Sequence, residues 1–194
     1  MRLNVNVTSQ GRLLDALLFL PDSSEGPLPA LLFEGTMTGA TNQIAEYVAK
    51  EVADQNFVCL VMDHSFYSEE EGLAQPWESP SKRLGDLKAA LQFLQHHNSI
   101  DPQKIVGVGV SVGAEYLAQI CREDNIIRGL IILEGPFDDS QNMAKDLDIP
   151  TIVIDETHLD SAVDEIVLWT RTLFDGAFVQ EEPQVKVDWS VMDE

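Results

Sequence analysis

The sequence has few basic residues and no long hydrophobic run. Its 12 lysines and arginines stand against 33 aspartates and glutamates, so the formal net charge is −21. A surface this acidic repels the phosphates of nucleic acids and the head groups of anionic lipids. No stretch approaches the roughly 18 apolar residues of a membrane-spanning helix. The composition therefore predicts a protein that binds neither nucleic acid nor a membrane.

Cysteine is scarce as well. The two cysteines, Cys59 and Cys121, lie in the apolar stretches FVCLVM and AEYLAQIC. We interpret both as small core residues rather than as a disulfide or a metal-binding pair. The N-terminal stretch MRLNVNV lacks the apolar segment of a signal peptide. We expect a cytoplasmic protein that needs no cofactor.

What the sequence does contain is a regular series of strand-like segments. Its 194 residues fit a single domain, residues 1–194. Leu3, Val5 and Val7 alternate with polar residues, and LLDALLFLP follows the turn SQG, which predicts an antiparallel hairpin. Five further strands are predicted at the apolar runs PALLFE, FVCLVMD, IVGVGV, GLIILE and PTIVID.

Helix-like segments lie between these runs. The first predicted helix has Thr41 as its N-terminal cap and Tyr47 on its apolar face. A second carries regularly spaced leucines, and two more cover residues 114–123 and roughly 160–174. Strands that alternate with helices form parallel sheets covered on both faces. The predicted fold class is therefore α/β, with a mostly parallel, doubly covered sheet of seven or eight strands and an N-terminal antiparallel hairpin.

The stretch GVGVSVGAEYLA, residues 107–118, carries the clearest functional signal. Gly109 and Gly113 flank Ser111 in a GxSxG pattern, with a strand before it and a helix after it. A sharp strand-to-helix turn would force Ser111 into a strained backbone conformation and project its hydroxyl above the sheet. Glycine neighbours allow the close backbone packing that such a turn needs. The pattern predicts a nucleophilic serine.

Two other interpretations of these residues stay open. Gly107, Gly109 and Gly113 also fit a loose GxGxxxG pattern of dinucleotide binding, in which Glu134 would bind a ribose. Alternatively, the stretch is a tight turn with a serine that starts a helix. A nucleotide site predicts a pocket beside Gly107 and Gly109, whereas a hydrolase site lies above Ser111.

The order of segments resembles the α/β-hydrolase superfamily, especially its dienelactone-hydrolase-like members. The resemblance covers roughly residues 12–160 and rests on PALLFEG, FVCLVMDH, DLKAALQFLQHHNSIDPQKIVGVGVSVG, GLIILEGPF and IPTIVIDE. It implies a sheet of the α/β-hydrolase type with Ser111 at the nucleophile position, where dienelactone hydrolases proper have a cysteine. It also implies an oxyanion hole formed by backbone N–H groups of Val112 and of the loop near Gly35 and Thr36.

The same resemblance places Glu34 where dienelactone hydrolases carry a glutamate beside the nucleophile. There the carboxylate would orient or gate the nucleophile. The alternative is a carboxylate at the end of a strand that faces solvent or bonds to the following loop.

The histidines do not follow the family's pattern. A serine nucleophile needs a base, and the histidine that the family carries after its last strand is missing. His96 and His97 end a predicted helix, where the dipole favours a cation, so we interpret them as structural. His64 we interpret as a solvated loop residue.

His158, in the stretch DETHLD, is the best remaining candidate for the base. The carboxylate that orients it would be Glu134, Asp160 or Asp155. A metal site at His158, Asp155 and Asp160 lacks a convincing set of further ligands, so we expect no metal.

Two functions remain in competition. The leading one is a small serine hydrolase that cleaves an ester, thioester or lactone through an acyl-enzyme at Ser111, with an atypical or incomplete triad and a small-molecule substrate. The rival is a catalytically inactive hydrolase-fold protein that binds a ligand or partner, as the missing terminal histidine suggests. The sequence leaves the substrate and the oligomeric state open.

Overall fold

Seven strands form one sheet in the computed structural model of the protein, which describes residues 1–23, 26–35, 39–62, 79–134, 140–155 and 159–175. The strand order is β1-β2-β4-β3-β5-β6-β7. The strands are β1 (Arg2–Ser9), β2 (Arg12–Phe19), β3 (Leu28–Glu34), β4 (Val58–Met62), β5 (Ile100–Val110), β6 (Ile127–Glu134) and β7 (Thr151–Asp155). The helices are α1 (Gly39–Ala53), α2 (Pro80–His96), α3 (Val112–Glu123), α4 (Ser140–Lys145) and α5 (Leu159–Phe174).

The hairpin of β1 and β2 closes on a two-residue turn. Gln10 and Gly11 both have positive φ, 48° and 80°, which is the geometry of the type I′ turn that matches the twist of paired strands. β2 then pairs antiparallel with β4, and all pairings from β4 to β7 are parallel. The predicted hairpin and the predicted parallel sheet are both confirmed.

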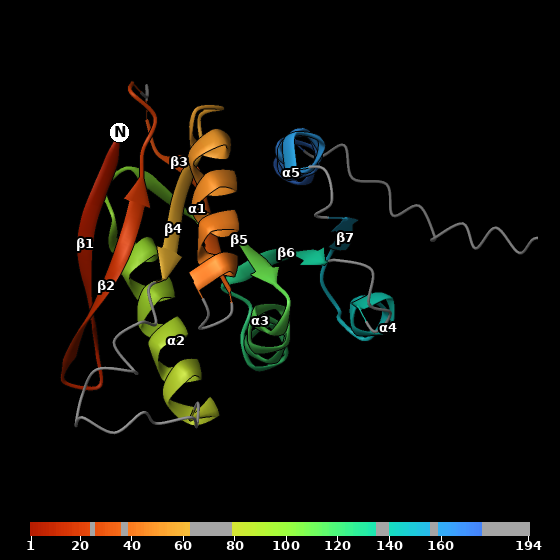
Figure 1. The fold of residues 1–194 in the computed structure, drawn as a ribbon, viewed down its shortest axis with the longest axis horizontal. Helices are drawn as coiled ribbons and strands as arrows, with labels where there is room; N and C mark the ends of the chain where they lie inside the picture. The colour runs from red at the N-terminus through yellow and green to blue at the C-terminus, as the bar shows by residue number, and fades with distance from the viewer. Residues whose placement is uncertain (24–25, 36–38, 63–78, 135–139, 156–158, 176–194) are drawn as a thin grey trace, which may run out of the picture.

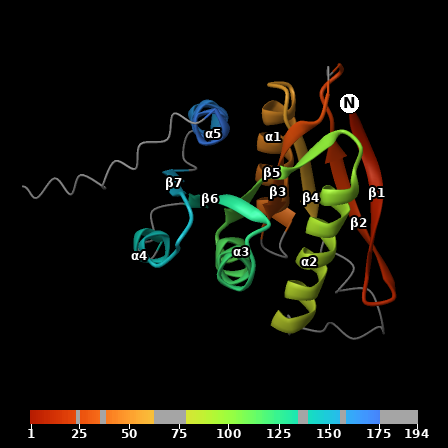
Figure 2. The same ribbon diagram turned by 180° about the vertical axis from the view of Figure 1, so that it is seen from behind.

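Helices cover both faces of the sheet (Figures 1 and 2). One core lies under α2 and α3 and includes Leu14, Leu87 and Leu117. The other lies under α1 and α5 and includes Phe33, Val48 and Ile166. Strands β3 and β5 contribute buried residues to both cores, which explains why their sequences are apolar without alternation. No helix among the described residues is long and apolar enough to cross a membrane.

Some predicted boundaries were wrong. α1 begins at Gly39 rather than after Thr41, and Tyr47 is 40% exposed instead of packed in the core. β5 begins at Ile100, five residues before the predicted start, because Leu28 of β3 pairs with Ile100. The next pair is Ala30 with Ile105, so the register shifts over the polar residues between Ile100 and Ile105. The short helix α4 was not predicted.

Candidate functional site

Four parallel strands, β3, β5, β6 and β7, bring their carboxyl ends together at one edge of the sheet. Glu34 of β3 pairs with Gly109 of β5, and Val110 pairs with Leu133 of β6. The backbone of Glu134 then pairs with that of Asp155 of β7. In an open α/β sheet this edge is the usual place for a ligand. The candidate site therefore lies where these strands end.

Ser111 stands at this edge, between the last residue of β5 and the first residue of α3. Its backbone has φ 55° and ψ −127°, a region that residues with a side chain rarely occupy. The residue is exposed, and its N–H donates to the Leu133 carbonyl at 3.3 Å. The predicted strained strand-to-helix turn at Ser111 is confirmed.

The two glycines that flank Ser111 are needed for space. A Cβ on Gly113 would collide with the carbonyl oxygen of Glu34 and lie 3.1 Å from the Gly35 nitrogen. A Cβ on Gly109 would lie 2.6 Å from the Ala114 nitrogen. Real Cβ atoms do not approach backbone this closely, so α3 reaches the ends of β3 and β5 only because both positions are glycine. This packing brings Val112 and Gly35, two of the predicted oxyanion residues, to the same edge as Ser111.

Gly107 does not open a pocket of its own. A Cβ there would lie 3.2 to 3.5 Å from side-chain atoms of Leu130, Leu117 and Ile127. Core side chains from α3 and β6 therefore cover this glycine. The nucleotide-binding interpretation, which predicted a pocket beside Gly107 and Gly109, does not fit the described residues.

Glu34 is fully buried and paired with an arginine from α2. Arg83 donates from Nε to the Glu34 carboxylate and from Nη2 to the Gly35 carbonyl oxygen. Its guanidinium carbon also lies 4.5 Å from the ring centre of Tyr116 in α3. The relative exposure of the two charged side chains is 0% and 1%, so neither meets solvent. This burial excludes the interpretation of Glu34 as a strand-end carboxylate that faces solvent.

Sequence reasoning missed Arg83, although a signal for it was present. Arg83 lies four residues before Leu87 and eight before Leu91, on the buried face of α2. An arginine on the apolar face of a helix requires a buried anion or carbonyl as its partner. The spacing indicates that Arg83 has a buried partner. The sequence does not show which residue that is, because Glu34 lies 49 positions away in the chain.

α2 is fixed by a second buried polar contact one turn further on. Ser9, the last residue of β1, donates from its hydroxyl to the Asp86 carboxylate at 2.5 Å. The Arg12 guanidinium lies 4.0 Å from the other oxygen of Asp86. The hairpin therefore holds the helix that carries Arg83.

The histidines that the structure describes lie at the other end of the sheet. His96 ends α2 and its Nδ1 bonds with the Gln92 carbonyl at 2.7 Å, while the Ser99 N–H donates to Nδ1 of His97 at 3.3 Å. The 11 residues of β5, at about 3.3 Å each, separate them from Ser111. Their local bonds fit the predicted structural role. His64 and His158 lie outside the described residues, as does Thr36.

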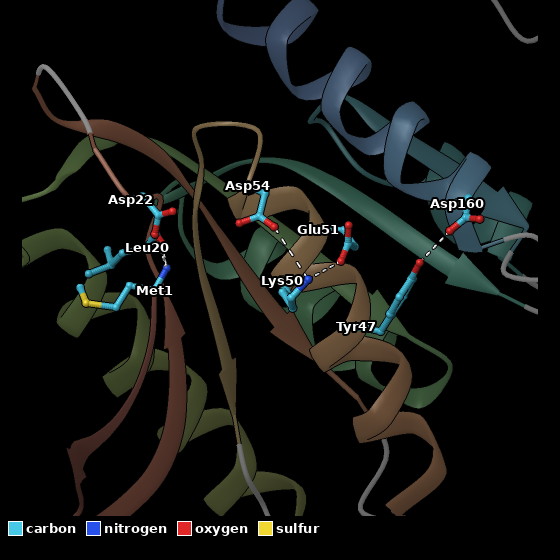
Figure 3. Close-up of polar contacts among 8 residues, drawn as sticks. All are labelled: Met1, Leu20, Asp22, Tyr47, Lys50, Glu51, Asp54 and Asp160. Atoms are coloured by element: carbon cyan, nitrogen blue, oxygen red, sulfur yellow. Dashed lines mark hydrogen bonds and ion pairs between the residues drawn. The ribbon is translucent and has the colours of Figure 1, made fainter.

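The predicted acids occupy different elements of this region. Glu134 and Asp155 end β6 and β7 as backbone neighbours. Asp160, in the first turn of α5, accepts a hydrogen bond from the Tyr47 hydroxyl of α1 at 2.7 Å (Figure 3). This bond raises the pKa of Tyr47 above its ordinary value. Asp160 thus has a partner that joins two helices on one face of the sheet.

Comparison with known proteins finds distant sequence relatives. No protein-family profile matches the chain. The quorum-quenching protein AidA of Acinetobacter baumannii is 26% identical over 144 residues, which cover 73% of this chain and 47% of AidA. The chain spans about half the length of this curated relative.

Solved structures resemble the chain more fully. Est1E from Butyrivibrio proteoclasticus superimposes with a TM-score of 0.69 at 12% identity, over 89% of this chain and 99% of Est1E. Dienelactone hydrolase from Anabaena variabilis superimposes with a TM-score of 0.62 at 14% identity, over 91% of this chain and 97% of that one. The chain therefore has the α/β-hydrolase fold, in the form that dienelactone hydrolases share.

Proposed function

We propose that this chain is a serine hydrolase that cleaves small esters, thioesters or lactones, with Ser111 as its nucleophile. The observation that carries the proposal is the backbone of Ser111, which is held at φ 55° and ψ −127° on an exposed turn at the carboxyl edge of the sheet. A strained turn of this kind persists only when its surroundings fix it, and such turns concentrate at active sites. The likeness of the fold to dienelactone hydrolase and Est1E supports the same class of substrate.

In this mechanism the Ser111 hydroxyl attacks the substrate carbonyl and forms an acyl-enzyme, which water then hydrolyses. The N–H of Val112 and the loop that starts at Gly35 and Thr36 stabilise the oxyanion of the tetrahedral intermediate. Arg83 is a positioning residue in this scheme, because its bond to the Gly35 carbonyl fixes the backbone from which that loop starts. Glu34 neutralises the buried guanidinium and keeps it in place.

The proton of Ser111 goes to His158 in this proposal, and a carboxylate orients the imidazole. Glu134 is the preferred carboxylate, followed by Asp160 and then Asp155. The hydrogen bond from Tyr47 supports placing Glu134 before Asp160, since it occupies one oxygen of Asp160 with a contact between two helices. Glu134 and Asp155 are candidates because they end β6 and β7 as backbone partners, one residue beyond the pairing of Leu133 with Val110 of β5.

The test combines labelling with hydrolysis. Wild-type protein should react with a fluorophosphonate probe and hydrolyse p-nitrophenyl acetate, because both need an activated serine. Ser111→Ala and His158→Ala should each lower kcat by a factor on the order of 10³ or more, since members of a catalytic unit are not additive. Ser81→Ala and His96→Ala are the matched controls, because Ser81 is exposed on α2 and His96 lies at its far end.

A separate variant tests the role of Arg83. Arg83→Lys keeps a positive charge near Glu34 but loses the fork that reaches the Gly35 carbonyl at the same time. A positioning role for the oxyanion predicts a lower kcat with little change in KM. A variant with wild-type kcat would remove Arg83 from the mechanism and leave it a structural residue.

One observation favours the rival function, a non-catalytic binding protein of hydrolase fold. The histidines in the described part of the chain lie at the end of the sheet opposite Ser111. If wild-type protein fails to react with the fluorophosphonate probe and hydrolyses p-nitrophenyl acetate no faster than Ser111→Ala, the binding function replaces the hydrolase. Labelling that survives in His158→Ala would instead keep the hydrolase and move the base to another group.

A further inference from the structure

The outer edge of β1 has no strand beside it in the described part of the chain. β1 ends the strand order, with β2 on its inner side (Figure 1). Its eight residues pair with β2 from Arg2 to Ser9 without a register shift. A long, regular edge of this kind presents a row of backbone groups to any strand that can align with it.

The residues whose backbone groups point outward follow from the hairpin's hydrogen bonds. The Met1 amino group donates to the Leu20 carbonyl at 2.6 Å (Figure 3), and the Leu20 N–H donates to the Met1 carbonyl at 2.9 Å. Bonded and non-bonded pairs alternate along an antiparallel ladder, so the odd-numbered residues of β1 bond to β2. The N–H and C=O groups of the even-numbered residues therefore face away from β2; these are Arg2, Asn4, Asn6 and Thr8.

β1 lacks the features by which edge strands usually avoid pairing. Natural edges carry proline, lysine, inward-pointing charges or a bulge. The strand RLNVNVTS has no proline, lysine or acidic residue, and its single charge is Arg2. In a chain with 33 acidic residues, a strand free of them is a surface on which two copies can meet without direct repulsion.

We propose that β1 pairs antiparallel with β1 of a second copy about a two-fold axis at Val5, which joins the two sheets into one. This register is the one that uses all the outward-facing residues: Arg2 pairs with Thr8 of the second copy, and Asn4 with Asn6. Each such pair exchanges two backbone hydrogen bonds. A shift by two residues in either direction leaves one outward residue of each copy unpaired.

The side chains match in the same register. Val5 and Val7 pack on the core under α2, and Leu3 lies on the same face of β1 by alternation. In the dimer Val5 lies opposite Val5 of the second copy, and Leu3 lies opposite Val7. Leu3 is 37% exposed in the single chain, so pairing would cover an apolar side chain that the monomer leaves open. On the other face β1 contributes the arginine, the asparagines and the threonine, and two of these bind acidic side chains of the same copy: Arg2 pairs with Glu46, and Asn6 donates to Asp15.

Net charge sets the conditions under which this dimer forms. Two copies with a formal charge of −21 each repel one another over distances longer than any contact in the interface. Salt reduces the range of this repulsion to about 10 Å at 0.1 M. The dissociation constant should therefore fall as salt rises, while an interface held by ion pairs would show the opposite dependence.

Analytical ultracentrifugation of the full chain tests the interface with a matched pair of substitutions. Leu3→Lys places a charge opposite Val7 of the second copy, and Leu13→Lys adds the same charge at a leucine of β2 that is 61% exposed on the other face of the hairpin. At about 0.5 M salt wild type and Leu13→Lys should dimerise, and Leu3→Lys should raise the dissociation constant at least about 10-fold. A wild-type monomer, or equal dimerisation of both variants, overturns the proposal.

Disulfide cross-linking tests the register independently. Residues at the two-fold axis form a non-hydrogen-bonded pair with Cα atoms about 4.5 Å apart, a separation that a disulfide can span. Val5→Cys should therefore cross-link on mild oxidation, whereas Leu3→Cys should not, because its counterpart is Val7. The native thiols do not compete, since burial raises the pKa of Cys121 to about 12 and that of Cys59 well above its ordinary value. Cross-linking of Leu3→Cys without that of Val5→Cys would refute this register.

Discussion

At the scale of single residues, the absence of a side chain at Gly113 is what lets α3 touch β3. A Cβ there would meet the backbone of Glu34 and Gly35, and backbone atoms cannot move aside as a flexible side chain can. The turn at Ser111 depends on this approach, because α3 starts at the residue after the serine. The shape of the candidate site is therefore controlled by a residue without functional groups.

We predict that Gly113→Ala lowers the stability of the protein by about 1–3 kcal/mol, as expected for overpacking, and abolishes labelling of Ser111. Gly26→Ala is the control, because nothing lies within 4 Å of a Cβ at that position. Chemical denaturation and fluorophosphonate labelling measure the two effects. Normal labelling of a well-folded Gly113→Ala would show that the close approach of α3 to β3 is not required.

The pair of Glu34 and Arg83 is the other decisive contact at this scale. Both side chains are out of water, and a buried charge that loses its partner costs far more than the pair contributes as a whole. The Arg83 guanidinium also satisfies the Gly35 carbonyl and contacts the Tyr116 ring. Its removal would leave several groups unsatisfied together.

We predict that Arg83→Met destabilises the protein by about 3–5 kcal/mol because the Glu34 carboxylate is left buried and unpaired. Adding Glu34→Gln should recover a large part of this loss, since the remaining side chain is neutral. Lys82→Met, an exposed neighbour on the same helix, should change stability by less than about 0.5 kcal/mol. Urea denaturation of the three variants measures these differences. A double variant no more stable than Arg83→Met would mean that the ion pair is not the cause.

At the scale of elements, α2 contacts the hairpin through buried polar side chains as well as through the apolar core. Ser9 and Arg12 close the hairpin on either side of its turn and both reach Asp86. The Gln10 side chain lies against Gly85, where a Cβ would collide with it. The loop between β1 and β2 therefore packs closely against α2 around Gly85 and Asp86, and this contact fixes the position of Arg83.

We predict that Ser9→Ala lowers the free energy of unfolding by about 1–3 kcal/mol, because the buried Asp86 carboxylate loses a hydrogen-bond donor. Thr8→Ala, at the neighbouring exposed position of β1, is the control and should have a small effect. Thermal and urea unfolding provide the measurement. Equal effects of the two substitutions would contradict the role given to Ser9.

The elements themselves could be predicted from the sequence, whereas the contacts between them could not. Strands such as β3 and β4 are buried on both faces, and their unbroken apolar runs report this directly. The start of β5 escaped prediction because IDPQK has the composition of a loop and is held in the sheet by Leu28. Arg83, Asp86 and the Tyr47–Asp160 bond escaped because each partner lies far away in the chain.

At the scale of the whole molecule, charge opposes compactness. A formal net charge of −21 on 194 residues means that folding brings many carboxylates closer together than they are in the unfolded chain. The sequence supplies only 12 lysines and arginines against 33 acidic residues, and surface pairs such as Lys88 with Glu123 are exposed. Exposed pairs of this kind contribute little.

We predict that the melting temperature rises when salt is increased from about 0.01 M to about 0.2 M, because screening weakens the repulsion. The rise should also occur in Leu3→Lys, which separates the effect on the folded chain from any effect of dimerisation. Differential scanning calorimetry at several salt concentrations provides the measurement. A melting temperature that stays level or falls would indicate that local ion pairs outweigh the net charge.

The strand order also determines when the parts of this sheet can form as the chain is made. β2 pairs with β4, although β3 and α1 lie between them in the sequence. A hairpin forms within about 1–10 μs, but ribosomes add only about 5–20 residues per second. The stretch from Phe19 to Met62 therefore takes on the order of 2–9 s to appear. During those seconds β2 lacks its partner strand β4, so the apolar face of the hairpin stays accessible to molecular chaperones.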